Sequence, residues 1–328
     1  MATSKSTSIN SLGDPDSDLR VTAVVVTYNP DLTQFGALLE RLLPQVQRVI
    51  VVDNGSDNAD DVGTLLESAG VAAGTPVTCI MGRENIGIAA AQNEGISLAM
   101  QLGADAVLLS DQDSLPEPTM VAKLQHCLHQ ACAVAASGAG APVAAVGPVP
   151  VEIRGQDDTT ALVYSYTKWG PKRRAIPSAS ESKDVPFVLA SGCLIPVEVL
   201  RHVGPMNESL FIDHVDLAWC LRAISMGYRI LACGDALLEH SLGEEIVHLP
   251  TGREVHVQSP ERNYYMVRNT LFLLSSDLMG WRWKVGYLQY LAKYLAFYTL
   301  VGTQEPGRIR ALLSGMRDGL RGRGGPRP

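Results

Sequence analysis

The sequence lacks several features that would identify whole classes of protein. No stretch of 18 or more residues is uniformly apolar, so the sequence predicts no membrane-spanning helix. The first 18 residues are rich in Ser and Asp and have no apolar core of the kind found in secretory leaders. We therefore expect residues 1–19 to form a disordered tail and the protein to be cytoplasmic. Walker-type phosphate loops and GxGxxG fingerprints are also absent.

Paired cysteine motifs are missing too. The six cysteines form no CxxC pair and no repeating spacing, which predicts reduced thiols. Residues 126–132 contain two His and two Cys, but no second ligand pair at zinc spacing accompanies them. We interpret this segment as an ordinary helix surface.

Charge is divided unevenly along the chain. Residues 1–260 carry 16 Lys and Arg against 30 Asp and Glu, whereas residues 261–328 carry 11 against 4. An acidic body argues against general nucleic-acid binding, and a basic C-terminal part fits an anionic surface such as a membrane. With 46% hydrophobic and 19% charged residues, the chain can bury a sizeable core, which predicts a globular protein.

Strand-like and helix-like segments alternate in the first third of the chain. Apolar, β-branched runs within residues 21–30, 48–58, 77–85 and 105–113 predict buried strands with the turns that close them. Segments with helical spacing lie between them, at residues 31–45, 61–70 and 87–103. This order predicts an α/β fold with an open, mostly parallel, Rossmann-like sheet flanked by helices.

The middle of the chain is harder to interpret. Residues 131–145 are rich in small side chains and predict a loose connection, and residues 154–184 have no clear period and predict a long loop over a substrate site. Strands and helices resume over residues 185–204 and 211–240. Residues 261–274 predict a helix, and the basic, Gly-rich residues 321–328 predict disorder.

Carboxylates follow two of the predicted strands. Asp53 ends the second strand, and Asp111 and Asp113 follow the fourth. Ligands of open parallel sheets bind outside the carboxyl ends of the strands, so these three side chains can meet at one crevice. Two adjacent carboxylates repel each other unless a cation neutralises them, and oxygen ligands suit a divalent cation. We therefore predict a cation there, Mg²⁺ or Mn²⁺.

Two other interpretations of the aspartate pair are also possible from the sequence. The aspartates could simply cap a turn or a helix. Alternatively, residues 111–115 resemble the DxDx[ST] nucleophile loop of haloacid-dehalogenase-type phosphatases. In that family the motif closes the first core strand, whereas here three strand–helix units precede it.

The ordered motifs as a set resemble family-two glycosyltransferases of the GT-A fold. They are "VVVTYNP", "VVDNGSD", "ENIGIAAAQNEGI", "LLSDQDS", "ASGCLIPVEVLRHVGPMNESLFIDHVDLAWCLRA" and "LLEHSLG", and the resemblance spans about residues 21–274. Within that family, "LFIDHVDLAWCLRA" and "YYMVRN" are most similar to bacterial rhamnosyltransferases that use dTDP-L-rhamnose. Those enzymes act on surface-polysaccharide intermediates or on rhamnolipids.

The resemblance implies roles for residues at the strand ends. It places Asp111 and Asp113 on the metal, with His240 completing the metal site as in some family members. It places the base, the ribose and the neighbouring phosphates of the sugar nucleotide at six residues: Thr27, Tyr28, Asp53, Asn85, Gly87 and Asp111.

An inverting transfer also needs one general base, which takes the proton of the acceptor hydroxyl. The segment "FIDHVD" supplies three candidates, in the order Asp213, Asp216 and His214. Many family members have Glu-Asp where this chain has Asp213 and His214, with the base at the second position. A helix-capping role is the alternative for Asp216. Arg222 could contact the diphosphate or pair with an acid.

The resemblance and the charge division together predict three parts: a tail (1–19), a GT-A domain (20–260) and a basic helical segment (261–328). Trp281 and Trp283 beside Arg282 and Lys284 suit a lipid–water interface, whereas an ordinary core-closing helix is the alternative. We expect a peripheral enzyme at the inner face of the bacterial plasma membrane. Its acceptor would be a lipid-linked O-antigen-type intermediate, or alternatively a mono-rhamnolipid. A catalytically silent sugar-nucleotide- or glycan-binding module is the hypothesis from another class.

Overall fold

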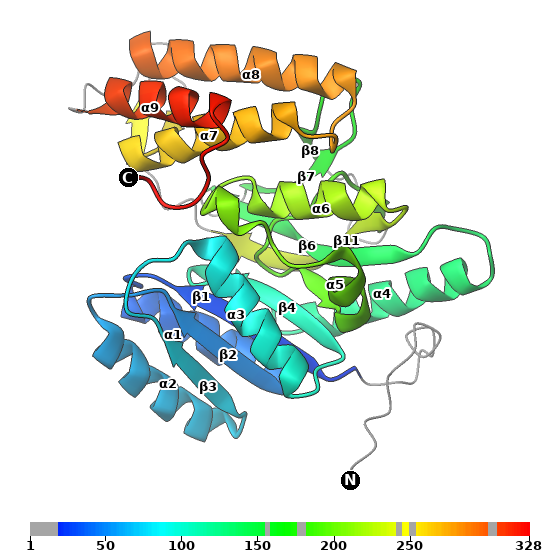
Figure 1. The fold of residues 1–328 in the computed structure, drawn as a ribbon. Helices are drawn as coiled ribbons and strands as arrows, with labels where there is room; N and C mark the ends of the chain where they lie inside the picture. Colours follow the sequence, from blue (N-terminus) through cyan, green and yellow to red (C-terminus); the bar gives the residue numbers. More distant parts are fainter. Residues whose placement is uncertain (1–18, 155–157, 176–181, 241–244, 249–253, 301–306) are drawn as a thin grey trace.

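The computed structural model describes residues 19–154, 158–175, 182–240, 245–248, 254–300 and 307–328. Figure 1 shows a large sheet with helices on its two faces, and a layer of three further helices beyond one end of it. The predicted tail at residues 1–18 lies outside the described residues, and Leu19, the first described residue, is buried.

Four parallel strands form one half of the sheet, in the order β3-β2-β1-β4. They run in register, so Thr27 at the end of β1 lies beside Asp53 at the end of β2. The order continues through β10, β6, β11 and β5, where antiparallel pairings enter. The bounds are β1 (Val21–Thr27), β2 (Arg48–Asp53), β3 (Val77–Met81), β4 (Ala106–Asp111), β5 (Ser114–Pro116), β6 (Val143–Arg154), β10 (Leu194–Pro196) and β11 (Arg229–His240).

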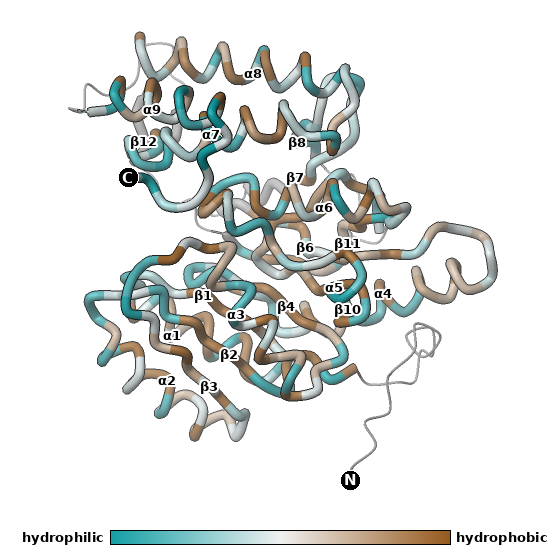
Figure 2. The backbone as a smooth tube through the Cα atoms, viewed as in Figure 1, coloured by the Kyte–Doolittle hydropathy of each residue, from teal (hydrophilic) through white to brown (hydrophobic). Residues whose placement is uncertain are grey.

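Helices cover both faces of the sheet, and the side chains explain which helix lies where. One apolar cluster joins the sheet to α1, α2 and α4, and a second joins it to α3, α5 and α6. Brown predominates along the central strands in Figure 2, and the helices alternate between brown and teal. The bounds are α1 (Leu32–Leu42), α2 (Ala59–Ala73), α3 (Ile88–Gln101), α4 (Met120–Ala136), α5 (Val197–Val203) and α6 (Val215–Ser225), with 3-10 turns η2 (Leu43–Gln45) and η3 (Glu208–Leu210).

Two predictions for the middle of the chain are wrong. Residues 131–136 continue α4, because a run of alanine and other small residues favours a helix when one face is covered, and residues 143–145 begin β6. Residues 154–184 are not one long loop. They form β7 (Asp158–Ser165), β8 (Lys172–Ala175) and β9 (Lys183–Asp184), in which β7 pairs with β6 and β9 with β11. These strands extend the edge of a sheet that the sequence pattern alone did not reveal.

Three helices complete the chain: α7 (Pro260–Ser275), α8 (Trp281–Leu300) and α9 (Arg308–Leu320). A small antiparallel pair, β12 (Glu245–His248) and β13 (Glu254–Val257), precedes them. Within the described residues, no helix combines the length and apolar character that crossing a bilayer requires.

Residues 321–328, predicted to be disordered, pack against the protein instead. Gly325 donates its backbone N–H to the carbonyl of Ser209 (2.8 Å), and Arg327 donates its own to the hydroxyl of Tyr265 (2.9 Å). The C-terminus therefore lies beside α7, on the side of the helical layer that faces the sheet (Figure 1).

Candidate functional site

The end of β1 and the end of β2 are joined through one buried carboxylate. Asp53 is fully buried and accepts hydrogen bonds from the Thr27 hydroxyl (2.9 Å), the Ser56 hydroxyl (2.6 Å) and the Ser56 backbone N–H (2.9 Å). The structure thus brings together two predicted nucleotide-binding residues, Thr27 and Asp53. In this arrangement Asp53 holds the side chains of Thr27 and Ser56 in place.

Side-chain hydrogen bonds also fix the loops that follow β1 and β4. The Gln112 amide accepts from the backbone N–H of Tyr28 (2.7 Å) and donates to its carbonyl (3.2 Å). Tyr28 is 46% exposed, so its ring is available to stack on a flat ligand. Gln112, the residue between the two predicted metal ligands, therefore sets the position of a predicted base-binding residue, a role that sequence reasoning missed.

A third loop, which follows β3, lies against the loop that follows β2. Asn54 donates to Asn85 Oδ1 (3.0 Å), and the same Asn85 oxygen accepts from the backbone N–H of Gly87 (2.9 Å). Gly87 has φ of 88°, and an added Cβ would lie 2.6 Å from the ring of Phe211. Glycine is needed there because the loop passes directly against the segment that leads into α6.

The aspartate pair lies at the open end of β4, where the prediction placed it. Asp111 and Asp113 are both half-buried, and the backbone N–H of Asp111 donates to the Ser191 hydroxyl (3.2 Å). Ser114, the next residue, is fully buried and is the register partner of His240 at the end of β11. The backbone of His240 thus lies beside the aspartate pair, although its side chain lies outside the described residues.

The segment before α6 holds the other acidic residues in an unusual conformation. Phe211, Asp213 and His214 all have positive φ, between 62° and 63°. Each non-glycine residue in this region costs on the order of 1–3 kcal/mol, and such strain persists only where neighbouring groups enforce it. We refer to residues 209–216 below as the acidic loop.

Buried side chains of α7 enforce that conformation. Asn269 donates to the carbonyls of Leu210 (2.9 Å), Ile212 (2.6 Å) and Asp213 (2.9 Å). Arg268 is fully buried and donates to the carbonyls of Ser209 (2.9 Å), Leu210 (2.8 Å) and Gly325 (2.5 Å). Sequence reasoning noted "YYMVRN" only as a family motif; two polar residues inside an otherwise apolar helix are the signal that could have singled them out.

The three candidates for the general base differ in their surroundings. Asp213 forms an ion pair with Arg262 (2.5 Å), and its side chain is only 5% exposed. The ring of His214 lies 3.0 Å from the Thr270 hydroxyl, and burial lowers the pKa of that imidazole. Asp216 lies in the first turn of α6, where its carboxylate accepts from the backbone N–H of Leu217.

Asp216 titrates unusually for a carboxylate. Burial raises its pKa to about 6, and the negative charges of Asp111 and Asp213 contribute in the same direction. The acidic loop therefore lies near the aspartate pair, since the charge of Asp111 affects the ionisation of Asp216.

Arg222 forms no ion pair with an acid among the described residues. Its guanidinium donates to the backbone carbonyls of Gly204 (3.2 Å) and Pro205, which precede the acidic loop. Its other predicted role, contact with a diphosphate, stays a prediction.

The residues of the aspartate pair fit a divalent cation that arrives with a ligand. Among the described residues, no group of three or more His, Cys, Asp and Glu side chains could hold a metal by itself. Mg²⁺ commonly takes only one or two carboxylates from a protein and completes its shell with phosphate oxygens and water. Asp111 and Asp113 supply that number.

Comparison with protein families gives one match over most of the chain. The model described as "Glycosyltransferase like family 2" matches residues 18–269. Among curated proteins, the dTDP-rhamnosyl transferase RfbF of Shigella flexneri is 33% identical over 259 residues, which are 78% of this chain and 80% of that protein. The galactofuranosyltransferase GlfT1 of Mycolicibacterium smegmatis is 27% identical over 270 residues, 78% of this chain and 83% of that protein.

Two solved structures share the fold at low identity. GalNAc-T7 with UDP, GalNAc and Mn²⁺ has a TM-score of 0.55 and 12% identity, and the match covers 89% of this chain but 59% of that one. S. aureus TarS 1-349 in complex with UDP-GlcNAc has a TM-score of 0.50 and 16% identity, over 93% of this chain and 82% of that one. The predicted α/β fold of GT-A type, with its C-terminal helices, is confirmed.

Proposed function

Because the chain belongs to glycosyltransferase-like family 2, we propose that it is an inverting rhamnosyltransferase, which moves L-rhamnose from dTDP-L-rhamnose to a hydroxyl group of a lipid-linked surface-polysaccharide intermediate. The observation that carries this proposal is the meeting of Asp216 with Asp111. It brings a carboxylate with a raised pKa to the strand end where a nucleotide diphosphate would lie. The 33% identity to a dTDP-rhamnosyl transferase supports the choice of sugar.

Asp216 is the residue best suited to act as base. The Asp213 carboxylate is already paired with Arg262. The Asp216 carboxylate is half-buried, and its pKa is raised to about 6, which is close to the pH at which a general base works best. Asp216 takes the proton of the acceptor hydroxyl as that oxygen bonds to the anomeric carbon. The bond from the anomeric carbon to the diphosphate oxygen breaks on the opposite face, and its electron pair leaves with the nucleoside diphosphate.

The remaining residues bind and orient the donor. Tyr28 offers an exposed ring to the base, and Thr27, fixed by Asp53, lies at the same edge. Asn85 and Gly87 border the nucleotide from the third loop. Asp111 and Asp113, with His240 as a further candidate, would hold a divalent cation, which when bound neutralises charge on the diphosphate.

Donor binding tests this proposal directly. At about 100-fold excess over the Kd, a bound ligand stabilises the folded state by about 2.7 kcal/mol, so dTDP-L-rhamnose with Mg²⁺ or Mn²⁺ is expected to raise the Tm by about 4 °C. The Asp113→Asn variant should lose most of that shift and the transfer activity. The exposed Asp61→Asn on α2 removes the same charge elsewhere and should retain both.

Two results would overturn the assignment. A larger Tm shift with a UDP- or GDP-sugar than with dTDP-L-rhamnose would mean that the donor is a different sugar nucleotide. The similarity to a galactofuranosyltransferase makes this comparison necessary. Full shift and full transfer in Asp113→Asn would remove the aspartate pair from the mechanism. Donor binding without transfer or hydrolysis under any condition would favour a binding module.

The exposed surface of α8 and α9 supports attachment to an anionic membrane. Ile309 and Leu313 on α9 are 59% and 61% exposed, and Leu288 on α8 is 58% exposed. The acid of α9, Asp318, is buried and paired with Arg317, and the surface of the two helices carries further positive side chains: Lys284, Lys293 and Arg310. Apolar side chains among cations suit an interface with acidic lipids.

Vesicle sedimentation tests this attachment. The protein is expected to sediment with vesicles that contain phosphatidylglycerol but much less with pure phosphatidylcholine. Leu313→Glu should lower the bound fraction several-fold, because it places a charge on the apolar face. The control Val71→Glu changes an 85% exposed residue of α2 and should bind as the wild type does. Equal binding by both variants would exclude this face.

A further inference from the structure

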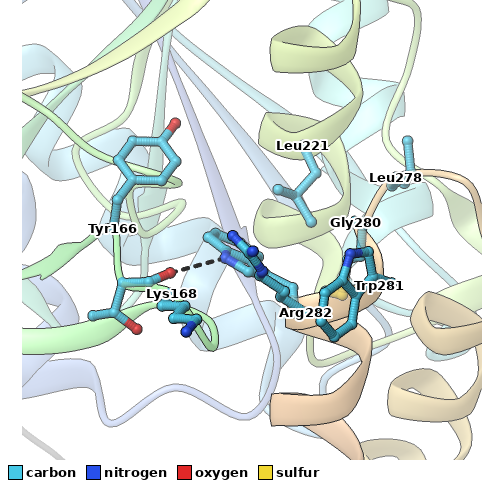
Figure 3. Close-up of a pocket in the computed structure, with 10 residues that line it drawn as sticks. Tyr166, Lys168, Leu221, Leu278, Gly280, Trp281 and Arg282 are labelled. Carbon is cyan, nitrogen blue, oxygen red and sulfur yellow. Dashed lines mark hydrogen bonds between the residues drawn. The ribbon is translucent and has the colours of Figure 1, made fainter.

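A cavity of about 510 Å³ lies between two loop segments and includes none of the residues predicted to bind the sugar nucleotide. One wall comes from the segment after β7 (Tyr166, Thr167 and Lys168), and the other comes from the turn between α7 and α8 and the start of α8 (Figure 3). A volume of this size is in the range of small-molecule sites. None of its lining residues belongs to the loops that follow β1, β2, β3 or β4.

Aromatic rings flank the cavity and are held in place. Trp283 donates its indole N–H to the carbonyl of Thr167 (3.0 Å), which ties the two walls together. The rings of Tyr166 and Trp283 lie 6.0 Å apart, and those of Trp169 and Trp281 lie 6.4 Å apart, edge to face. Tyr166 and Trp281 nevertheless remain 48% and 66% exposed. Fixed, exposed rings of this kind bind the apolar faces of sugar rings at little cost in side-chain entropy.

The charge of the cavity has one sign. Lys168 and Arg282 line it, and its described lining includes no Asp or Glu. Each cation lies over an indole, Lys168 Nζ at 5.3 Å from the Trp169 ring and the Arg282 guanidinium at 5.2 Å from the Trp281 ring. Neither forms an ion pair within the described part of the chain. Two such cations favour an anionic group, and a guanidinium pairs especially well with phosphate.

The cavity adjoins the catalytic carboxylate along two helices. Leu221 on its wall is five residues along α6 from Asp216, about 7.5 Å. Trp283 is one turn along α8 from Tyr287, whose ring lies 6.1 Å from that of His214. The cavity and Asp216 are thus connected through α6 and through the contact between α8 and His214.

We propose that this cavity is an acceptor subsite for a sugar that carries a phosphate group, and this proposal rests on the proposed function. The rings of Tyr166 and Trp281 hold the sugar, and Arg282 and Lys168 hold the phosphate. The acceptor hydroxyl, on another unit of the same glycan, then lies at Asp216. The cavity thus selects acceptors by a phosphorylated sugar that is not the one being modified.

Intrinsic fluorescence can follow binding, because two of the four tryptophans, Trp281 and Trp283, line the cavity and a third, Trp169, packs against Trp281. The fourth, Trp219, is buried in the core and gives a constant background. Titration of the full chain with N-acetylglucosamine 1-phosphate is expected to give a saturable change in emission with a Kd in the millimolar range or below. Arg282→Gln should weaken that Kd at least about tenfold, since a charged hydrogen bond to phosphate is lost.

Further variants and alternative ligands test this proposal. Trp281→Phe should bind nearly as the wild type does, and Trp281→Ala should bind weakly. Inorganic phosphate or phosphatidic-acid vesicles that reproduce the whole response would overturn the sugar assignment, and no saturable change up to about 50 mM would overturn the site. Asp113→Asn should lose donor stabilisation but keep this titration. Failure of the donor assignment therefore leaves the cavity result intact, and the converse also holds.

Discussion

Replacement of Asp216 by Asn is expected to slow sugar transfer by about 10²–10⁴-fold while donor binding is retained, because the amide cannot accept the proton of the acceptor hydroxyl. The side chain keeps its shape and its place in the first turn of α6. Steady-state transfer assays, with donor affinity measured separately by thermal shift, separate the two effects. Asp213→Asn is the informative comparison, since it breaks the ion pair with Arg262.

The pH dependence sharpens this prediction. A base whose pKa is raised to about 6 is deprotonated above that pH, so kcat should be level near pH 7–8 and fall about tenfold per unit below pH 6. Asp216→Asn should abolish this fall in kcat below pH 6. If Asp213→Asn removes it and Asp216→Asn preserves it, the base is Asp213.

Stability should change in the opposite direction to activity. The folded-state pKa of Asp216 lies above that of an unfolded aspartate, so the folded state loses stability as pH rises from about 4 through about 6 and this carboxyl ionises. Asp216→Asn removes that cost, and its Tm at pH 8 should exceed that of the wild type. A lower Tm together with lost activity would indicate misfolding instead of a missing base.

The second large effect is expected at Arg268. Arg268→Met leaves the carbonyls of Ser209, Leu210 and Gly325 without this donor, and each such loss costs about 1–3 kcal/mol. The unfolding free energy should fall by about 3 kcal/mol or more, measured by denaturant unfolding. Arg201→Met, an exposed site on α5, should change it by less than about 0.5 kcal/mol.

Arg268→Lys distinguishes positioning from bulk packing. An ammonium group keeps the charge but cannot reproduce a planar set of donors aimed at three carbonyls and an amide oxygen. We expect a folded protein whose kcat falls more than tenfold with little change in donor affinity and a displaced pH profile, since the acidic loop would relax from its positive φ values. An unchanged kcat and pH profile in a folded Arg268→Lys protein would contradict the positioning role.

Local sequence patterns were sufficient for the parallel half of the fold. Its strands are continuous apolar runs, and Asp53 and Asp111 lie at strand ends because parallel strands finish on the same edge of a sheet. The pattern failed over residues 154–184, where strands at the edge of the sheet carry polar residues and no clean alternation. It also failed for the C-terminal end of α4, residues 131–136, whose small side chains resemble a linker until the sheet covers them.

The candidate site could be predicted only where its residues lie close together in sequence. Asp111 and Asp113 were found because one strand ends there, whereas the roles of Arg262, Arg268 and Asn269 depend on contacts across about 50 to 60 residues. The carbonyl partners of Arg222 were missed for the same reason, because they come from a turn before the acidic loop.

The hydrogen bonds between the C-terminal residues and the acidic loop set an order of events during synthesis. Ser209 leaves the ribosome 116 residues before Gly325, the residue whose backbone pairs with it. At a translation rate of about 5–20 residues per second, Gly325 is synthesised on the order of ten seconds after Ser209. Until then the acidic loop lacks this hydrogen bond. The loops after β1, β2 and β3 can therefore be complete while Asp213 and Asp216 are still loosely held, so under the proposed function a ribosome-bound chain should bind nucleotide before it can transfer sugar.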